Sequence, residues 1–167
     1  MDIIIFGGQS NMQGQTERLS ECAVVEGARE YKMLSDELVP LRNPVGEDIT
    51  YEGTAGYTFQ EGTDAAAWLE AHALGSACYG HTNMVPAFCR SYLARTRGSV
   101  AAVHAAKGST TVAQWLPGTP EYELLVRKIS AAVRKVKTID GVGHISFVWL
   151  QGESDAIEGK TKARYKA

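Results

Sequence analysis

Ile3-Ile4-Ile5-Phe6 leads directly into Gly7-Gly8-Gln9-Ser10, and this first stretch of the chain decides the fold. Two later segments, residues 99–104 and 144–150, are likewise apolar at nearly every position rather than at alternate ones. Continuous apolar runs of this kind are typical of strands that are covered on both faces, as in a parallel sheet between helices. The sequence therefore predicts an α/β fold built on these strands.

Helix signals fall between the expected strands. Thr119, Pro120 and Glu121 supply an N-cap, a proline at the first helical position and an acid in the first turn. Five apolar residues then fall on one helical face: Leu124, Leu125, Ile129, Val133 and Val136. A second helix is predicted over residues 83–95. A helix between the second and third strands is the usual way to join parallel strands.

The remaining segments are harder to assign. Residues 15–40 are expected to be partly helical, because small or apolar residues recur in approximate helical register. These residues are Val24, Ala28, Tyr31 and Leu34. Residues 41–63 contain several glycines and a proline and predict a loop. Residues 160–167 resemble a helix without a stop signal, so we expect one domain over residues 1–167 that is cut within an element.

Composition excludes several classes of protein. The chain has 167 residues, which suits one domain, and its net charge is −2, which argues against a nucleic-acid footprint. No apolar run reaches the roughly 18 residues of a membrane span, and the N-terminus has no signal-peptide pattern. Cys22, Cys78 and Cys89 lack metal or redox spacing and are expected to be reduced and mostly buried. We therefore predict a cytoplasmic protein with no membrane or nucleic-acid partner.

Small and polar residues follow all three expected strands. We expect these residues to lie at one edge of the parallel sheet. Ser10 is placed to act as a nucleophile, although on this segment alone capping of the next helix is the simpler interpretation. Gly108 lets a backbone N–H approach a ligand closely, or it marks an ordinary turn. Gln151, Glu153 and Asp155 supply an amide and two carboxylates after the third strand. Ligands of open α/β sheets bind at this edge, so the convergence favours a functional site.

Three blocks of this sequence resemble a known family. They are Gly8-Gln9-Ser10-Asn11-Met12, the segment from Ala106 to Trp115, and Trp149-Leu150-Gln151-Gly152-Glu153-Ser154-Asp155-Ala156. Together they resemble the signature blocks of the sialate O-acetylesterase domain family. That family includes the acetylxylan esterases of carbohydrate esterase family 6 and belongs to the SGNH-hydrolase superfamily.

The resemblance implies a serine esterase on a flavodoxin-like parallel sheet between helices. Ser10 matches the nucleophile, and its N–H matches one donor of the oxyanion hole. The N–H of Gly108 and the side-chain amide of Gln151 match the other two donors. The role of Glu153 stays open between orienting the catalytic histidine and holding the turn.

Two further residues of these blocks are expected to support the site. Asn11 is expected to fix the nucleophile turn and Asp155 to cap the next helix.

The sequence departs from the family at the catalytic histidine, which the family places in a C-terminal Asp-x-x-His block. None of the four histidines stands in such a motif, and each is expected to be structural. They are His72, His81, His104 and His144. We therefore expect the chain to end before its catalytic histidine, and no base is assigned. No metal or organic cofactor is expected, because no Cys, His or carboxylate spacing suggests one.

Two functions remain open on this evidence. The first is removal of O-acetyl groups from carbohydrates such as acetylxylan or acetylated sialic acid, or from small acetyl esters, through an acetyl-enzyme on Ser10. The second is a catalytically silent module of the same fold that binds glycans or a protein. Its binding surface would use aromatic residues that could stack on sugars: Tyr57, Trp68, Tyr79 and Trp115.

Overall fold

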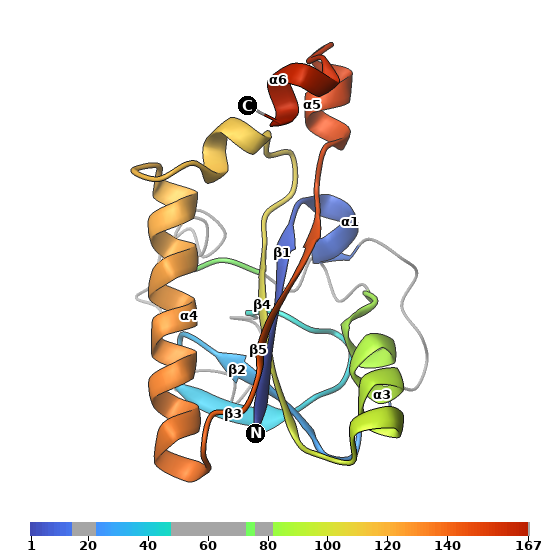
Figure 1. Cartoon of the computed structure of the whole chain (residues 1–167), viewed down its shortest axis with the longest axis vertical. Helices are drawn as coiled ribbons and strands as arrows, with labels where there is room; N and C mark the ends of the chain where they lie inside the picture. Colours follow the sequence, from blue (N-terminus) through green and yellow to red (C-terminus); the bar gives the residue numbers. More distant parts are fainter. Residues whose placement is uncertain (15–22, 48–72, 76–81, 167) are drawn as a thin grey trace, which may run out of the picture.

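The computed structural model describes residues 1–14, 23–47, 73–75 and 82–166 (Figure 1). In chain order the elements are β1 (Asp2–Gly8), α1 (Ser10–Gln13), β2 (Ala28–Lys32), β3 (Glu37–Pro40), α3 (Val85–Thr96), β4 (Val100–Ala106), the 3₁₀ helix η2 (Val112–Trp115), α4 (Pro120–Ile139), β5 (Ile145–Leu150), α5 (Glu153–Ile157) and α6 (Lys162–Lys166). No helix among these residues is both long and apolar enough to cross a lipid bilayer.

The strands form one sheet in the order β3-β2-β4-β1-β5. β1 is parallel to both β4 and β5, and β2 is parallel to β4, whereas β3 is antiparallel to β2. The chain passes from β1 to β4 on one side and then to β5 on the other. This order matches the first three strands of a flavodoxin-like sheet. The predicted α/β fold is confirmed, with an antiparallel hairpin added at one edge.

Helices cover both faces of the sheet, with α4 on one side and α3 on the other (Figure 1). Ile3 and Ile5 of β1 belong to the core beneath α4, whereas Ile4 and Phe6 belong to the core beneath α3. Successive side chains of a strand point to opposite faces, which explains why β1 is apolar at every position. The prediction of a strand covered on both faces is therefore confirmed for β1.

The two predicted helices are present. The side-chain oxygen of Thr119 accepts the Tyr122 N–H (3.4 Å) and caps α4, and Pro120 is its first residue. The predicted inward face of α4 is confirmed: Leu124, Leu125 and Val136 are buried, and Ile129 and Val133 pack against the same core.

α3 corresponds to the other predicted helix and buries Cys89 against the sheet. Burial raises the pKa of this free thiol to about 12, so it is chemically inert. Cys22 and Cys78 lie outside the described residues.

The partly helical segment expected within residues 15–40 is wrong where the structure describes it. Residues 28–40 form the β2–β3 hairpin, with Arg29 opposite Pro40 and Lys32 opposite Glu37. The alternation typical of a strand was concealed, because the inward positions of β2 include charged Glu30 and Lys32, both buried. Residues 41–47 form a loop as predicted, and residues 15–22 and 48–63 lie outside the described residues.

β5 differs from the prediction that all three strands are covered on both faces. It pairs with β1 at the edge of the described sheet, and its large side chains are substantially exposed. Phe147 is 48% exposed and Trp149 36% exposed. A continuous apolar run predicts a core strand, but it does not show whether the described residues place a neighbour on each side of that strand.

A buried ion pair holds two loops against α4. Lys128 of α4 and Glu47 are both fully buried, and their charged atoms are 2.9 Å apart. Lys128 Nζ also donates to the Leu74 carbonyl oxygen at 2.7 Å. Burial opposes ionisation of Glu47, but the ammonium of Lys128 and the backbone N–H of Met33 outweigh it and lower its pKa. This charge pair joins α4 to two loops that are distant in sequence.

Removing one member of this pair should be costly. We expect Lys128→Met to lower the free energy of unfolding by about 3–5 kcal/mol, because the Glu47 carboxylate stays buried without its cation. The double variant Lys128→Met/Glu47→Gln should recover part of the loss, since no unpaired charge remains. Urea denaturation at pH 7 measures both values. A single variant within about 1 kcal/mol of wild type would contradict the assignment.

Candidate active site

The turns after β1, β4 and β5 lie at the same edge of the sheet (Figure 1). Gly8 of β1 is in register with Ala106 of β4 on one side and with Leu150 of β5 on the other. Both partners are the last residues of their strands. In open α/β sheets, ligands bind beyond this edge at the point where the strand order reverses, which here is β1.

The first turn carries Ser10 at the start of α1. Gly8 has φ +140°, and a Cβ there would lie 1.9 Å from the Leu150 carbonyl oxygen, so a side chain would not fit. Ser10 is the first helical residue, Gln9 holds the N-cap position, and no side chain caps the helix. The capping interpretation of Ser10 is therefore wrong. Its side chain is partly exposed, and its hydroxyl has no hydrogen-bond partner among the described residues.

The second turn brings Gly108 against the first. A Cβ built on Gly108 would lie 3.6 Å from the Ser10 Cβ and 3.1 Å from Oε1 of Gln13. The Gly108 N–H donates to that same Gln13 oxygen at 2.8 Å. The structure thus places the predicted nucleophile beside the predicted backbone donor, but the side chain of Gln13 occupies the donor.

The third turn is joined to the first by two contacts. Asn11 Nδ2 donates to Oε1 of Glu153, and the Ser154 N–H donates to Oε1 of Gln9 (3.2 Å). Asn11 therefore joins the turn after β1 to the turn after β5, through Glu153. The second oxygen of Glu153, Oε2, is buried and has no hydrogen-bond partner among the described residues.

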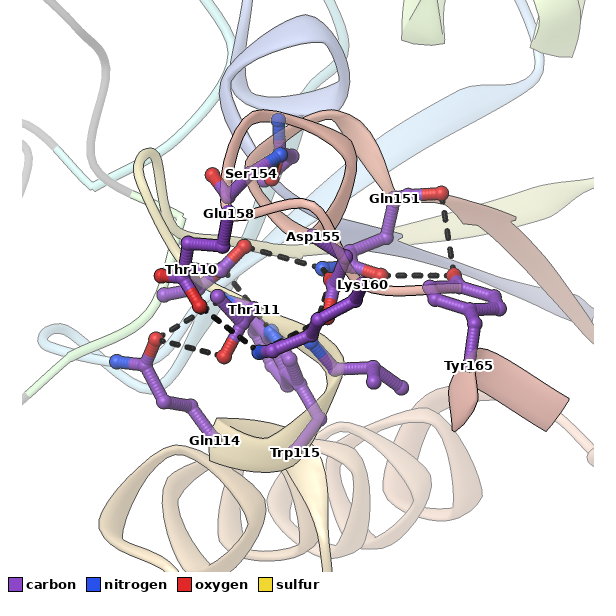
Figure 2. Close-up of polar contacts among 12 residues, drawn as sticks. Thr110, Thr111, Gln114, Trp115, Gln151, Ser154, Asp155, Glu158, Lys160 and Tyr165 are labelled. Carbon is purple, nitrogen blue, oxygen red and sulfur yellow. Dashed lines mark hydrogen bonds and ion pairs between the residues drawn. The ribbon is translucent and has the colours of Figure 1, made fainter. Parts of the chain in front are cut away.

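The amide of Gln151 is committed to a polar network shown in Figure 2. Its Nε2 donates to the Thr110 carbonyl oxygen (3.0 Å) and to Oδ2 of Asp155 (2.7 Å). Its Oε1 accepts from the Tyr165 hydroxyl at 2.7 Å. A carboxamide has two N–H hydrogens, so both are used here. In this conformation Gln151 joins the turns, and neither N–H of its amide is free to donate to a substrate.

Asp155 is the hub of that network. Its Oδ2 accepts the Val112 N–H at 2.8 Å, and its Oδ1 pairs with Lys160 at 3.1 Å (Figure 2). Burial opposes its ionisation, but the bonds from Gln151 and Val112 and the Lys160 charge outweigh burial and lower its pKa. Asp155 was expected to cap the next helix. It lies inside α5 instead, and it holds the start of η2.

The described histidines have structural positions. His104 is fully buried in β4, with Nε2 3.0 Å from the Met12 carbonyl oxygen and Nδ1 3.3 Å from that of Gly75. His144 precedes β5 at the opposite end of the sheet, where it pairs with Asp2. His72 and His81 lie outside the described residues. Within the described residues, no group of three or more His, Cys, Asp or Glu could hold a metal ion.

The aromatic residues near this edge pack on one another. Trp115 is buried, and its ring meets Trp149 edge to face with centroids 5.3 Å apart. Its Nε1 donates to the Thr110 hydroxyl at 3.0 Å, so the ring is part of the core and not an open stacking surface. The other aromatic residues considered for sugar binding, Tyr57, Trp68 and Tyr79, lie outside the described residues.

A family model described as carbohydrate esterase, sialic acid-specific acetylesterase, matches residues 1–167. The chain belongs to this family. A comparison with curated protein sequences gives no significant match. The fold of this esterase-family chain is similar to the crystal structure of an Arabidopsis thaliana protein, with a TM-score of 0.56 and 19% identity. The alignment covers 99% of this chain and 66% of the Arabidopsis chain, so this chain spans less than two thirds of that protein's length.

Sequence reasoning missed two side chains of this esterase-family site. Gln13 lies three residues after Ser10 in α1, and that spacing places both on one side of a helical turn, a signal that was available. Tyr165 contacts Gln151 from a separate helix, and nothing in the local sequence indicates such a contact.

His104 also has a consequence for the family member's stability. Burial, together with Lys128 and Lys32 nearby, lowers its pKa from 6.5 to about 4, although its bond to the Met12 carbonyl opposes the shift. The folded state therefore binds this proton less tightly than the unfolded chain does. The stability linked to His104 is intact above pH 6.5 and is lost as the pH falls toward 4.

We expect this loss to reach about 3 kcal/mol at pH 4, as follows from the shift in the pKa. His104→Gln keeps an amide donor for the Met12 carbonyl but does not titrate, so its stability should depend less on pH between 6.5 and 4. Urea unfolding of both proteins across this range measures the difference. Parallel pH profiles for the two proteins would show that His104 does not titrate as described.

Proposed function

We propose that this chain forms the nucleophile-bearing part of a serine esterase that removes O-acetyl groups from carbohydrates. The observation that carries the proposal is the placement of Ser10 beside the N–H of Gly108, beyond the carboxyl ends of β1 and β4. Membership of the carbohydrate esterase family supports the substrate class. Acetylated xylan, acetylated sialic acid and small acetyl esters all fit this chemistry.

In the proposed reaction, Ser10 Oγ attacks the acetyl carbonyl carbon and its proton passes to a base. The tetrahedral oxyanion is held by the N–H groups of Ser10 and Gly108. Collapse breaks the bond between the acetyl carbon and the sugar oxygen, and the base returns its proton to that oxygen, which leaves as a hydroxyl. Water then attacks the acetyl-enzyme by the same route and releases acetate. We assign the base to the histidine of the family's Asp-x-x-His block, which does not occur in residues 1–167. The acid that orients this histidine is either the aspartate of that block or Glu153.

Gln151 is proposed as the third donor of the oxyanion hole. It can act only if one Nε2 hydrogen leaves Thr110 or Asp155, just as the Gly108 N–H can act only if Gln13 leaves it. The same observation favours the alternative function, a catalytically silent module that binds glycans or a protein at this edge. Turnover decides between the two.

Ser10→Ala should abolish ester hydrolysis by protein expressed from the complete reading frame. We expect kcat for p-nitrophenyl acetate to fall by about 10³-fold or more, because loss of a nucleophile removes the covalent route. Ser130→Ala, on the exposed side of α4, is the matched control and should retain wild-type turnover. A wild type without activity would favour the binding module. An active Ser10→Ala variant would show that another residue is the nucleophile.

Glu153→Gln separates the two roles left open for this residue. A glutamine oxygen can still accept from Asn11, so the turn should hold and the unfolding temperature should stay close to wild type. We nevertheless expect kcat to fall by about 10²-fold or more, because the buried Oε2 would no longer be a carboxylate acceptor for the histidine. Glu123→Gln on the exposed face of α4 is the control. A kcat within twofold of wild type would leave Glu153 with the turn-holding role alone.

A further inference from the structure

The side chain of Gln13 occupies the position next to the nucleophile where a substrate oxygen is expected. Its Oε1 accepts the Gly108 N–H at 2.8 Å, within the range of an oxyanion-hole contact. The same oxygen lies 3.1 Å from where a Gly108 Cβ would stand, and Ser10 Cβ lies 3.6 Å from that point. The three groups therefore share one small region of the site.

A carboxamide oxygen resembles the carbonyl oxygen of an ester in shape and in its lone pairs. We propose that Gln13 is an internal acceptor that blocks the Gly108 donor in the resting protein and must be displaced before an acetyl carbonyl can bind. This inference rests on the proposed esterase function. It gives Gln13 a role in selecting what the site accepts, because only a group that replaces its hydrogen bond can enter.

The substrate oxygen and the Gln13 oxygen compete for the Gly108 N–H, and the substrate oxygen competes more strongly as the reaction proceeds. A ground-state ester carbonyl is neutral and gains little over the neutral carboxamide that it displaces. The oxyanion of the tetrahedral intermediate makes charge-assisted bonds, which are roughly twice as strong as neutral ones. Both the ester and the oxyanion must break the bond between Gln13 and Gly108, so the cost of displacing Gln13 is the same for the two. The stronger contact of the oxyanion offsets more of that cost.

Two substitutions at Gln13 should change activity in opposite directions. Gln13→Met has a similar length but no strong acceptor, so it frees the Gly108 N–H. We expect kcat/KM for p-nitrophenyl acetate to rise about fivefold, the factor that corresponds to one neutral hydrogen bond. Gln13→Glu keeps an acceptor and adds negative charge where the oxyanion forms, so kcat/KM should fall about tenfold or more.

The opposite signs separate this role from a purely structural one. If Gln13 only held the turn, both substitutions would lower activity. Amide hydrogen exchange at Gly108 gives a second measurement, and the exchange should be faster in Gln13→Met at an unchanged unfolding temperature. If Gln13→Met does not fold, Gln13→Asn replaces it, because its shorter side chain does not reach Gly108 and should give the same rise.

The experiment uses protein from the complete reading frame, with Ser10→Ala measured in parallel. A wild type without Ser10-dependent turnover overturns the esterase proposal and this inference with it. Ser10-dependent turnover that is unchanged or slower in both Gln13→Met and Gln13→Asn overturns only this inference. A faster Gln13→Met together with a slower Gln13→Glu supports it.

Discussion

The pairing of β1 with a parallel neighbour on each side is the constraint on which the rest of the structure depends. Gly8 is in register with the last residue of β4 and with the last residue of β5, so all three chains leave the sheet at one level. Parallel pairing fixes this level through backbone hydrogen bonds, whatever the side chains are. The turns that follow can then meet, and short polar side chains are long enough to join them.

Those polar side chains connect every pair of turns. Gln13 joins the first turn to the second, Asn11 joins the first to the third, and Gln151 and Asp155 join the third to the second. Each link runs from a side chain to a backbone group or to another side chain. The links of Gln13, Gln151 and Asp155 are partly buried, where an unmade hydrogen bond is costly, whereas that of Asn11 is exposed. The turns are therefore positioned together. A donor that serves as a link, such as the Gln151 amide, is correspondingly harder to release for a substrate.

The sequence was sufficient for features that depend on local pattern. Apolar runs located β1, β4 and β5, and the Thr119 cap located α4, because each signal is contained in the segment itself. It was not sufficient where the decisive partner is distant. Glu30 and Lys32 concealed β2, because they are buried through bonds to the backbone of Gly46 as well as by pairing with each other, and the position of Gly46 cannot be seen in the segment. The hydrogen bonds of Gln151 depend on Tyr165 and Thr110, which are distant in sequence and meet Gln151 only in the folded chain.

The buried charges of Lys128 and Lys32 also bear on the turn that carries Ser10. Lys128 and Lys32 are each paired with a carboxylate, yet their positive charge still acts on His104 and adds to burial in keeping the ring neutral. A neutral imidazole has one N–H to give, and the shorter of its two contacts, to the Met12 carbonyl, is the better place for it. Met12 lies two residues after Ser10. Burial and the two ammonium groups thereby favour the protonation state in which His104 supports the turn that carries Ser10.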